Sequence, residues 1–176
     1  MKQDVYVVDY GVFSHIGQRR QNQDAVMVMQ TRVPSGQVGR LLAVADGMGG
    51  HLGGEIASHL ACDGLKQYFE KELNNKIVND PKEIARRLSE AILHIDRRIR
   101  QKGLRDSSLE DMGTTLSCLA ITETHSVIAH VGDSRIYRLR KGVLSCLTVD
   151  HTFVQDMFLK ARWTLRKPTC IPCVIC

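Results

Sequence analysis

The stretch that decides the fold is an apolar run that ends in glycines, reading Leu41-Leu42-Ala43-Val44-Ala45-Asp46-Gly47-Met48-Gly49-Gly50-His51. Its first residues are continuously apolar, which is typical of a strand covered on both faces. From about Glu55 to Leu73, apolar residues recur at helical spacing. We therefore predict a strand, a glycine-rich turn and a helix, with Asp46 at the end of the strand.

Strands are predicted on both sides of this unit. Two β-branched, apolar runs precede it, at Val5–Val12 and Asp24–Gln30. Four more runs of strand character follow it: Thr115–Thr122, Ser126–Val131, Arg135–Leu139 and Val143–Thr148. Their short connections favour antiparallel neighbours in a meander. Two helices between groups of such strands indicate an α+β domain.

The second helix has clear boundary signals. Asp80 is a good N-cap, Pro81 suits the first helical position, Glu83 completes a capping-box pattern, and Gly103 is a stop signal. Between them runs an apolar stripe at i, i+4 and i+8 spacing. The arginines of this helix are predicted to form a solvated outer face; they are Arg86, Arg87, Arg97, Arg98 and Arg100.

Composition limits the function classes. The 176 residues, 43% of them hydrophobic, suit one globular domain. No apolar run reaches the roughly 18 residues of a membrane helix, and the first residues contain no long apolar signal segment. We therefore predict a cytoplasmic protein without a membrane partner. The net charge of +5 falls to +2 over residues 1–160, so nucleic-acid binding is not predicted.

Several residues suggest metal-assisted phosphate chemistry. A dinucleotide-binding turn is excluded, because its third glycine would fall at Leu52. A carboxylate at a strand end, such as Asp46, suits Mg²⁺ or Mn²⁺. Asp24 and Asp133 are candidate ligands for the same site, although turn aspartates more often bond their own backbone. Arg19 is a candidate phosphate clamp. Together these groups are what metal-assisted phosphoester hydrolysis requires.

Five segments, in this order and at fitting separations, carry a family resemblance: Gly17–Asp24, Ala45–Ser58, Gly113–Thr115, His130–Arg135 and Thr148–Thr152. Together they resemble the bacterial type of the metal-dependent PPM/PP2C protein serine/threonine phosphatases. The resemblance implies a four-layer αββα sandwich, with two antiparallel sheets flanked by helices. It also implies hydrolysis of phosphoserine and phosphothreonine in proteins by a metal-activated water at a binuclear Mn²⁺ or Mg²⁺ site.

The resemblance also implies a role for each matching residue. Asp46 would bridge both ions, and the Gly47 carbonyl would bind one of them. Asp24 would hold metal-bound water, and Arg19 would clamp the substrate phosphate. Asp133 matches an aspartate linked to a third, looser ion.

Other matching positions have supporting roles in this resemblance. Met48 stands where some members carry a histidine general acid, so the leaving group must be protonated from elsewhere. The positions expected to be structural are Thr114, Thr115, Ser134 and Arg135. The implied partners are phosphorylated proteins, with a serine/threonine kinase acting in opposition. The competing hypothesis is a non-catalytic phosphoprotein-binding module.

The resemblance ends near Lys160, where the composition also changes. We divide the chain into an incomplete phosphatase domain at 1–160 and a divergent, basic tail at 161–176. When residues 161–176 are back-translated and read one nucleotide earlier, Trp163 followed by Thr164 forces an Asp codon. We therefore infer a frameshift in the coding sequence, either real or introduced by sequencing. The family's later Asp-Gly-Leu and Asp-Asn motifs are missing. We therefore expect the 176-residue chain to have very low activity and to expose apolar strand edges, which favours aggregation.

Overall fold

The computed structural model describes residues 9–32, 38–49, 52–72, 80–122 and 124–151. Their order is β1 (Asp24–Arg32), β2 (Val38–Met48), α1 (Gly53–Glu72), α2 (Pro81–Arg105), a short 3₁₀ helix η1 (Ser107–Leu109), β3 (Gly113–Thr114), β4 (Leu116–Ile121), β5 (Ser126–Val131), β6 (Tyr137–Arg140) and β7 (Val143–Cys146). Neither helix in these ranges is long and apolar enough to cross a bilayer.

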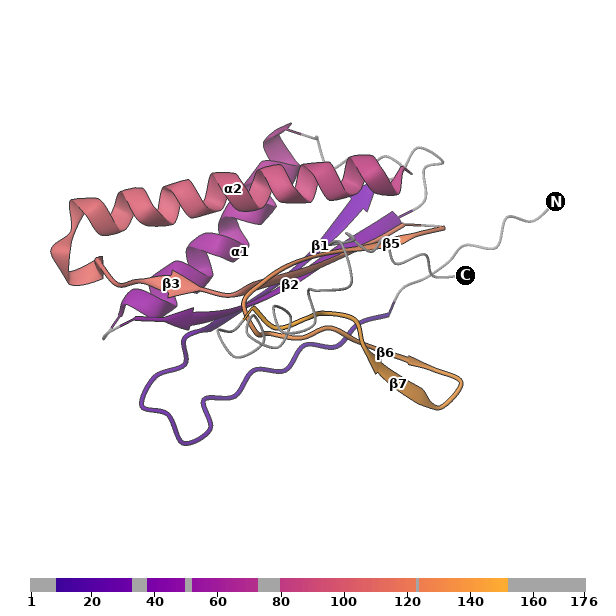
Figure 1. Cartoon of the computed structure of the whole chain (residues 1–176), viewed down its shortest axis with the longest axis horizontal. Coiled ribbons are helices and arrows are strands. Elements are labelled where there is room, and N and C mark those ends of the chain that lie inside the picture. The colour runs from indigo at the N-terminus through magenta and orange to yellow at the C-terminus, as the bar shows by residue number, and fades with distance from the viewer. Residues whose placement is uncertain (1–8, 33–37, 50–51, 73–79, 123, 152–176) are drawn as a thin grey trace, which may run out of the picture.

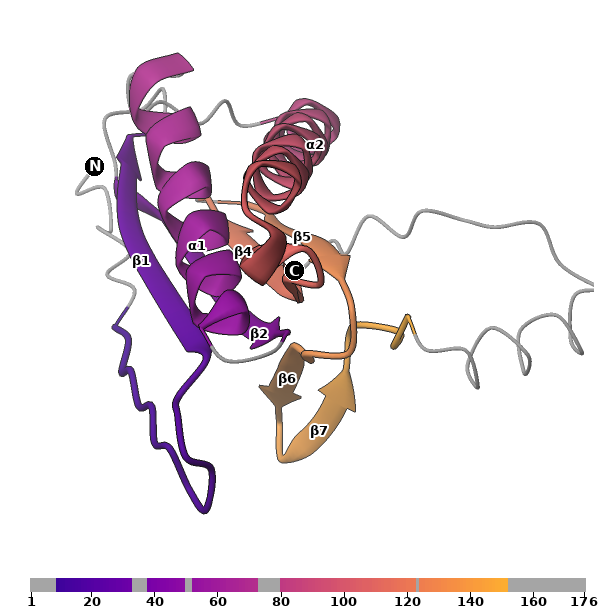
Figure 2. The same cartoon turned by 90° about the vertical axis from the view of Figure 1, so that its left-hand side faces the viewer.

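The elements form one main sheet with both helices on the same face. The sheet has the order β1-β2-β4-β5, with β3 pairing with β2, and every pairing is antiparallel. Both helices lie above it in Figure 1, and the β6–β7 hairpin lies below (Figures 1 and 2). This arrangement confirms the predicted α+β class with antiparallel sheets.

The core lies between the helices and the sheet. On β1, residues 25, 27 and 29 alternate toward the helices, as the period of a strand requires. From α1, Leu65 and Phe69 are almost completely buried against this surface. The predicted stripe of α2 is also buried, and its members include Ile84, Leu88 and Ile95. The helix face of the sheet is therefore closed by this chain itself.

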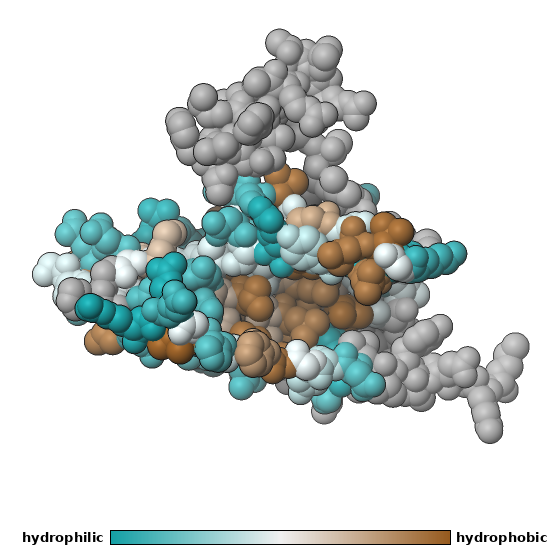
Figure 3. Space-filling view, turned by 90° about the horizontal axis from the view of Figure 1, so that it is seen from below, coloured by the Kyte–Doolittle hydropathy of each residue, from teal (hydrophilic) through white to brown (hydrophobic). Residues whose placement is uncertain are grey.

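The opposite face of the sheet is largely uncovered by the described residues. Val26 and Val44, whose side chains point to this face, are 39% and 40% exposed. Figure 3 shows apolar side chains in a hollow when the molecule is viewed from below. The hollow contains a groove of about 310 Å³ between residues 11–13 on one side and Arg135 and Ile136 on the other. Apolar side chains of paired strands are therefore exposed on this face, among the described residues; the predicted exposure of apolar strand edges is a separate property and stays a prediction.

The hairpin corrects one prediction. The meander holds for β4 with β5 and for β6 with β7, but β5 and β6 belong to different sheets. Gly132, at φ +104°, begins the segment that carries the chain from one sheet to the other. Two positive-φ residues, Lys141 and Gly142, then form the two-residue turn of the hairpin.

Three further local predictions need correction. Residues 9–12 form no strand, since the structure gives this segment no strand partner, and residues 5–8 lie outside the described ranges. The helix α2 continues past Gly103 to Arg105 and ends at its C-cap Asp106, whose amide donates to the Gly103 carbonyl. Asp80 does cap α2, but the Glu83 side chain pairs with the arginines of the next turn instead of completing a capping box.

Candidate active site

Two predicted acids face each other where β1 begins and β2 ends. Asp24 and Asp46 are directly opposite in the antiparallel register of these strands. The next backbone pair is hydrogen-bonded, since the Gly47 amide donates to the Gln23 carbonyl at 3.0 Å. Asp24 and Asp46 therefore form a non-hydrogen-bonded pair, the kind in which opposite side chains lie closest.

The charges around Asp46 show which other predicted residues come near it. The pKa of Asp46 is raised first by partial burial, and next by the negative charges of Asp24 and Asp133. A hydrogen bond from its carboxyl group to that of Asp24 raises the pKa further, while the Arg19 guanidinium lowers it. The fold thus brings three acids and one arginine, all predicted from the sequence, into one electrostatic cluster.

Two threonines hold the backbone of Asp46 in place. The Asp46 amide donates to Thr115 Oγ1 at 2.9 Å, and the Thr115 amide donates to the Asp46 carbonyl at 2.9 Å. Thr114 Oγ1 donates to the same carbonyl at 3.0 Å. Both backbone groups of Asp46 are therefore fixed from one side, which leaves its carboxylate to face the site.

A chain of polar contacts links these threonines to the segment that carries Asp133. Thr115 Oγ1 and Ser134 Oγ lie 2.7 Å apart. Ser117 Oγ donates to the Ser134 carbonyl at 2.7 Å and lies 2.9 Å from His130 Nδ1. The expectation that Thr115 and Ser134 are structural is confirmed by these contacts, which position both sides of the site.

Arg135, also expected to be structural, ties the same segment to residue 150. Its guanidinium binds both carboxylate oxygens of Asp150, at 2.8 and 2.6 Å. This bidentate pair lowers the pKa of Asp150. The His151 amide also donates to the Gly132 carbonyl at 2.8 Å. The turn that carries Asp133 is thereby fixed at both ends.

Glycine at 47 allows the end of β2 to touch the first turn of α1. A Cβ at this position would lie 1.9 Å from the Gly54 carbonyl oxygen, closer than any side chain permits. The Gln21 amide group donates to Glu55 Oε2 at 2.6 Å, which fastens the Arg19 segment to the same turn of α1. This close packing determines the direction in which the chain leaves Asp46.

The donor set fits a hard divalent cation in its chemistry but is small. Asp24 and Asp46 offer carboxylate oxygens; burial first and the charge of Asp24 second raise the pKa of Asp46, and a cation would relieve the repulsion between the two acids. Among the described residues, however, no three His, Cys, Asp or Glu side chains gather closely enough to hold an ion. Asp133 acts on Asp46 through its charge, without completing such a cluster.

The other residues singled out for the site in the sequence are either exposed or lie outside the described ranges. Arg19 and Met48 are exposed, and Met48 is the last residue of β2. His51 and the 161–176 tail lie outside the described residues, so the tail remains a prediction. Sequence reasoning included His130 in one of the five segments but assigned it no role. In the structure its Nδ1 lies 2.9 Å from Ser117 Oγ and its Nε2 lies 3.2 Å from the Val149 carbonyl oxygen. Nothing in the sequence around a lone histidine on a strand indicates such a bridging position.

Fold and site together place two facing carboxylates, Asp24 and Asp46, at the end of an antiparallel sheet, with the charges of Asp133 and Arg19 acting on Asp46. A family model described as protein phosphatase 2C matches residues 13–158. This chain therefore belongs to the protein phosphatase 2C family.

Individual relatives agree with this assignment. Over 125 residues the chain is 37% identical to the serine/threonine protein phosphatase PstP of Mycobacterium tuberculosis, covering 71% of this chain and 23% of PstP. Over 160 residues it is 35% identical to the protein phosphatase PhpP of Streptococcus pneumoniae, covering 89% of this chain and 61% of PhpP. The chain thus spans less than two thirds of these relatives.

Solved structures resemble the chain as well. The serine/threonine phosphatase Stp1 from Staphylococcus aureus superposes with a TM-score of 0.71 at 32% identity, over 85% of this chain and 56% of Stp1. The catalytic domain of PstP in complex with two manganese ions gives a TM-score of 0.65 at 34% identity, over 88% of this chain and 58% of that domain. The similarity extends over most of this chain and a little over half of each solved protein.

Proposed function

We propose that this chain carries the Arg19, Asp24 and Asp46 part of a metal-dependent protein serine/threonine phosphatase site. The observation that carries the proposal is the register that sets Asp24 directly opposite Asp46 at the end of β1 and β2. The charges of Asp133 and Arg19 also act on Asp46. Family membership and the phosphatase names of the relatives support it. The proposed reaction is hydrolysis of phosphoserine and phosphothreonine in proteins.

Each residue has a proposed task in this reaction. Asp46 and Asp24, with the Gly47 carbonyl, would hold a cation; the guanidinium of Arg19 would bind the substrate phosphate in bidentate fashion. Mn²⁺ or Mg²⁺, when bound, supplies activation of water and neutralisation of phosphate charge. The manganese ions of the PstP catalytic domain support this choice of cofactor. Asp133 would add negative charge near the same place.

The remaining proposals concern the level of activity, the substrates and a second candidate function. Since a two-ion site needs more carboxylates than the described residues bring together, we propose that the 176-residue chain has very low activity. Its substrates would be cytoplasmic phosphoproteins made by an opposing serine/threonine kinase. The smallness of the donor set also supports a second candidate, a non-catalytic module that binds phosphoproteins through Arg19.

The test combines metal binding, phosphopeptide binding and turnover. Calorimetry measures Mn²⁺ binding, which we expect to be lost in Asp46→Asn. The control Asp63→Asn changes an exposed acid of α1 and should retain the binding. Robust Mn²⁺-dependent turnover that Asp46→Asn abolishes would support the phosphatase and overturn the low-activity proposal. Phosphopeptide binding without metal or turnover would favour the binding module. Absence of both binding and turnover would refute both candidates.

A further inference from the structure

A pocket of about 370 Å³ lies between α1 and the C-terminal half of α2. Leu60 of α1 lines it on one side, and the other lining residues are on α2 or directly after it: Arg98, Gln101, Lys102, Arg105 and Asp106. The three cations of this set are spaced at i, i+4 and i+7, so they lie on one face of the helix. We call it the Arg98 pocket.

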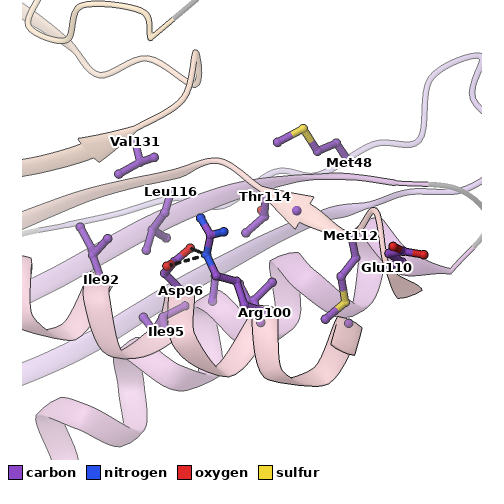
Figure 4. Close-up of a pocket in the computed structure, with 14 residues that line it drawn as sticks. Met48, Ile92, Ile95, Asp96, Arg100, Glu110, Met112, Thr114, Leu116 and Val131 are labelled. Carbon is purple, nitrogen blue, oxygen red and sulfur yellow. Dashed lines mark hydrogen bonds and ion pairs between the residues drawn. The ribbon is translucent and has the colours of Figure 1, made fainter. Parts of the chain in front are cut away.

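The cations of the Arg98 pocket differ from other arginines of the same helix. Arg86 and Arg87 both pair with Glu83, and Arg100 pairs with Asp96 at 2.9 Å. Figure 4 shows this last pair at the rim of another pocket, between α2 and the end of β3. Within the described part of the chain, by contrast, the three cations of the Arg98 pocket form no ion pair. Their charge is therefore available to a ligand.

The acid that lines the Arg98 pocket is engaged elsewhere. Asp106 is the N-cap of η1, and its Oδ1 accepts from Ser108 Oγ at 2.6 Å and from the Ser108 amide at 3.0 Å. These bonds lower the pKa of Asp106, so it stays charged and occupied by its own turn. The lining thus combines three positive charges with one negative charge, which leaves a net charge of +2.

The guanidinium of Arg98 is positioned by α1. Arg98 is half-buried, and its Nη1 donates to Gln67 Oε1 at 3.2 Å. The same nitrogen would lie 3.8 Å from a Cβ at Gly64. Arg98 is seven residues before the last residue of α2, beyond the single turn over which the helix dipole attracts a cation. A guanidinium held in this way is prepared for bidentate contact with an anion.

Charge and size together select the ligand. A phosphate monoester carries a charge of about −1.5 to −2 at pH 7, which matches the net charge of the lining, whereas a single carboxylate would neutralise only half of it. The volume is near the lower end of the roughly 300–1,000 Å³ typical of ligand pockets, which suits a phosphate with a small attached group. Leu60, which packs partly against the core, offers an apolar contact to that group.

We infer that the Arg98 pocket binds a phosphate monoester, with Arg98 in bidentate contact and Lys102 and Arg105 supplying further charge. The phosphate belongs either to a small molecule or to a phosphorylated side chain, and the recognised group is the same. This site is separate from the proposed active site. Ala45 is buried toward the helices, so the next side chain of β2, Asp46, points to the opposite face of the sheet.

The experiment titrates the isotope-labelled 176-residue chain with methyl phosphate, in metal-free buffer at constant ionic strength, and follows it by NMR. We expect saturable shifts of the Arg98 Nε–H signal and of the backbone amides of Lys102 and Arg105. Methyl phosphate should bind about tenfold more tightly than acetate, because its dianion neutralises the whole net charge. The Gly47 amide reports separately on the proposed active site.

Matched variants test the position of the site. Arg98→Gln is expected to weaken the binding of methyl phosphate about tenfold, because it removes a charge-assisted contact. Arg97→Gln makes the same change of charge at the neighbouring residue, which is exposed and does not line the pocket, so its affinity should stay within about twofold. Lys102→Gln, at an exposed position, provides a second loss of charge. Unchanged amide signals of the buried Leu65 and Phe69 show that each variant is folded.

The outcomes separate this inference from the proposed function. A shift of the Gly47 amide alone would support the proposed active site and overturn the Arg98 pocket as a phosphate site. Saturable binding that Arg98→Gln and Lys102→Gln weaken supports the pocket, whether or not the Gly47 amide responds. Equal weakening by Arg97→Gln, or equal binding of acetate, would show a response to general charge and overturn the inference.

Two larger probes then distinguish the sources of the phosphate. A nucleoside monophosphate that binds more tightly than methyl phosphate, and loses this affinity in Arg98→Gln, identifies a small-molecule ligand. A phosphothreonine peptide that behaves in this way identifies a phosphorylated protein. If neither probe shifts the Lys102 and Arg105 amides, the pocket does not accept a phosphate monoester and the inference is wrong.

Discussion

Replacing Thr115 with valine tests how the fold holds the central acid. Thr115 is only 8% exposed, and its hydroxyl accepts from the Asp46 amide at 2.9 Å and contacts Ser134 Oγ at 2.7 Å. Valine keeps the shape and removes both hydrogen bonds. Each bond contributes about 1 kcal/mol net, and a buried donor left without an acceptor costs about 1–3 kcal/mol. We therefore expect Thr115→Val to lower the free energy of unfolding by about 2–4 kcal/mol.

Two measurements check this expectation, one global and one local. Urea unfolding followed by circular dichroism gives the loss of stability, and amide hydrogen exchange reports directly on the Asp46 N–H. The control is Thr114→Val, which removes a bond to the Asp46 carbonyl but leaves the Thr115 amide on the same oxygen. If Thr115→Val costs no more than Thr114→Val, or if the Asp46 amide exchanges at its wild-type rate, the reasoning is refuted.

Three more changes follow from the same structure. Gly47→Ala places a Cβ 1.9 Å from the Gly54 carbonyl oxygen and should destabilise the fold by about 3 kcal/mol or more; an unchanged urea midpoint would contradict this contact. Burial first, and the neighbouring His151 second, lower the pKa of His130 from 6.5, so the folded state takes up this proton less readily than the unfolded state. Stability should therefore fall as the pH drops below about 6.5, and His130→Asn should flatten that slope. Val44→Thr should reduce self-association in light scattering, since this side chain is 40% exposed on the open sheet face; equal scattering would count against that face as the cause.

Local sequence signals predicted most elements because those elements depend on local physics. The caps of α2 show both the strength and the limit of this reasoning. Asp80 accepts from the Lys82 amide as an N-cap should, whereas Gly103 does not end the helix. Glycine is needed at this position because a Cβ there would lie 3.0 Å from the Leu109 carbonyl oxygen. A glycine required by a tertiary contact cannot be told from a stop signal in the sequence.

The acids of the candidate site were predictable from the sequence, but the contacts that connect them were not. The five segments identified Asp24, Asp46 and Asp133, and the fold brings their charges together. The connection between them was not predictable, because the bond between Thr115 and Ser134 joins residues 19 apart on different segments. The pocket between α2 and the end of β3 was missed for the same reason, since it forms from residues far apart in the sequence.

The open face of the sheet connects the stability of this chain with its chemistry. Val44 and Asp46 are two residues apart on β2, so both side chains point to the face opposite the helices. On that face Arg40 Nε and Nη1 are buried without a hydrogen-bond partner among the described residues, and Val26 is 39% exposed. A further layer of polypeptide there would bury the valines, offer an acceptor to Arg40 and bring new groups next to Asp46. Because these consequences follow from one packing event, completion of the core and completion of the site are expected to occur together.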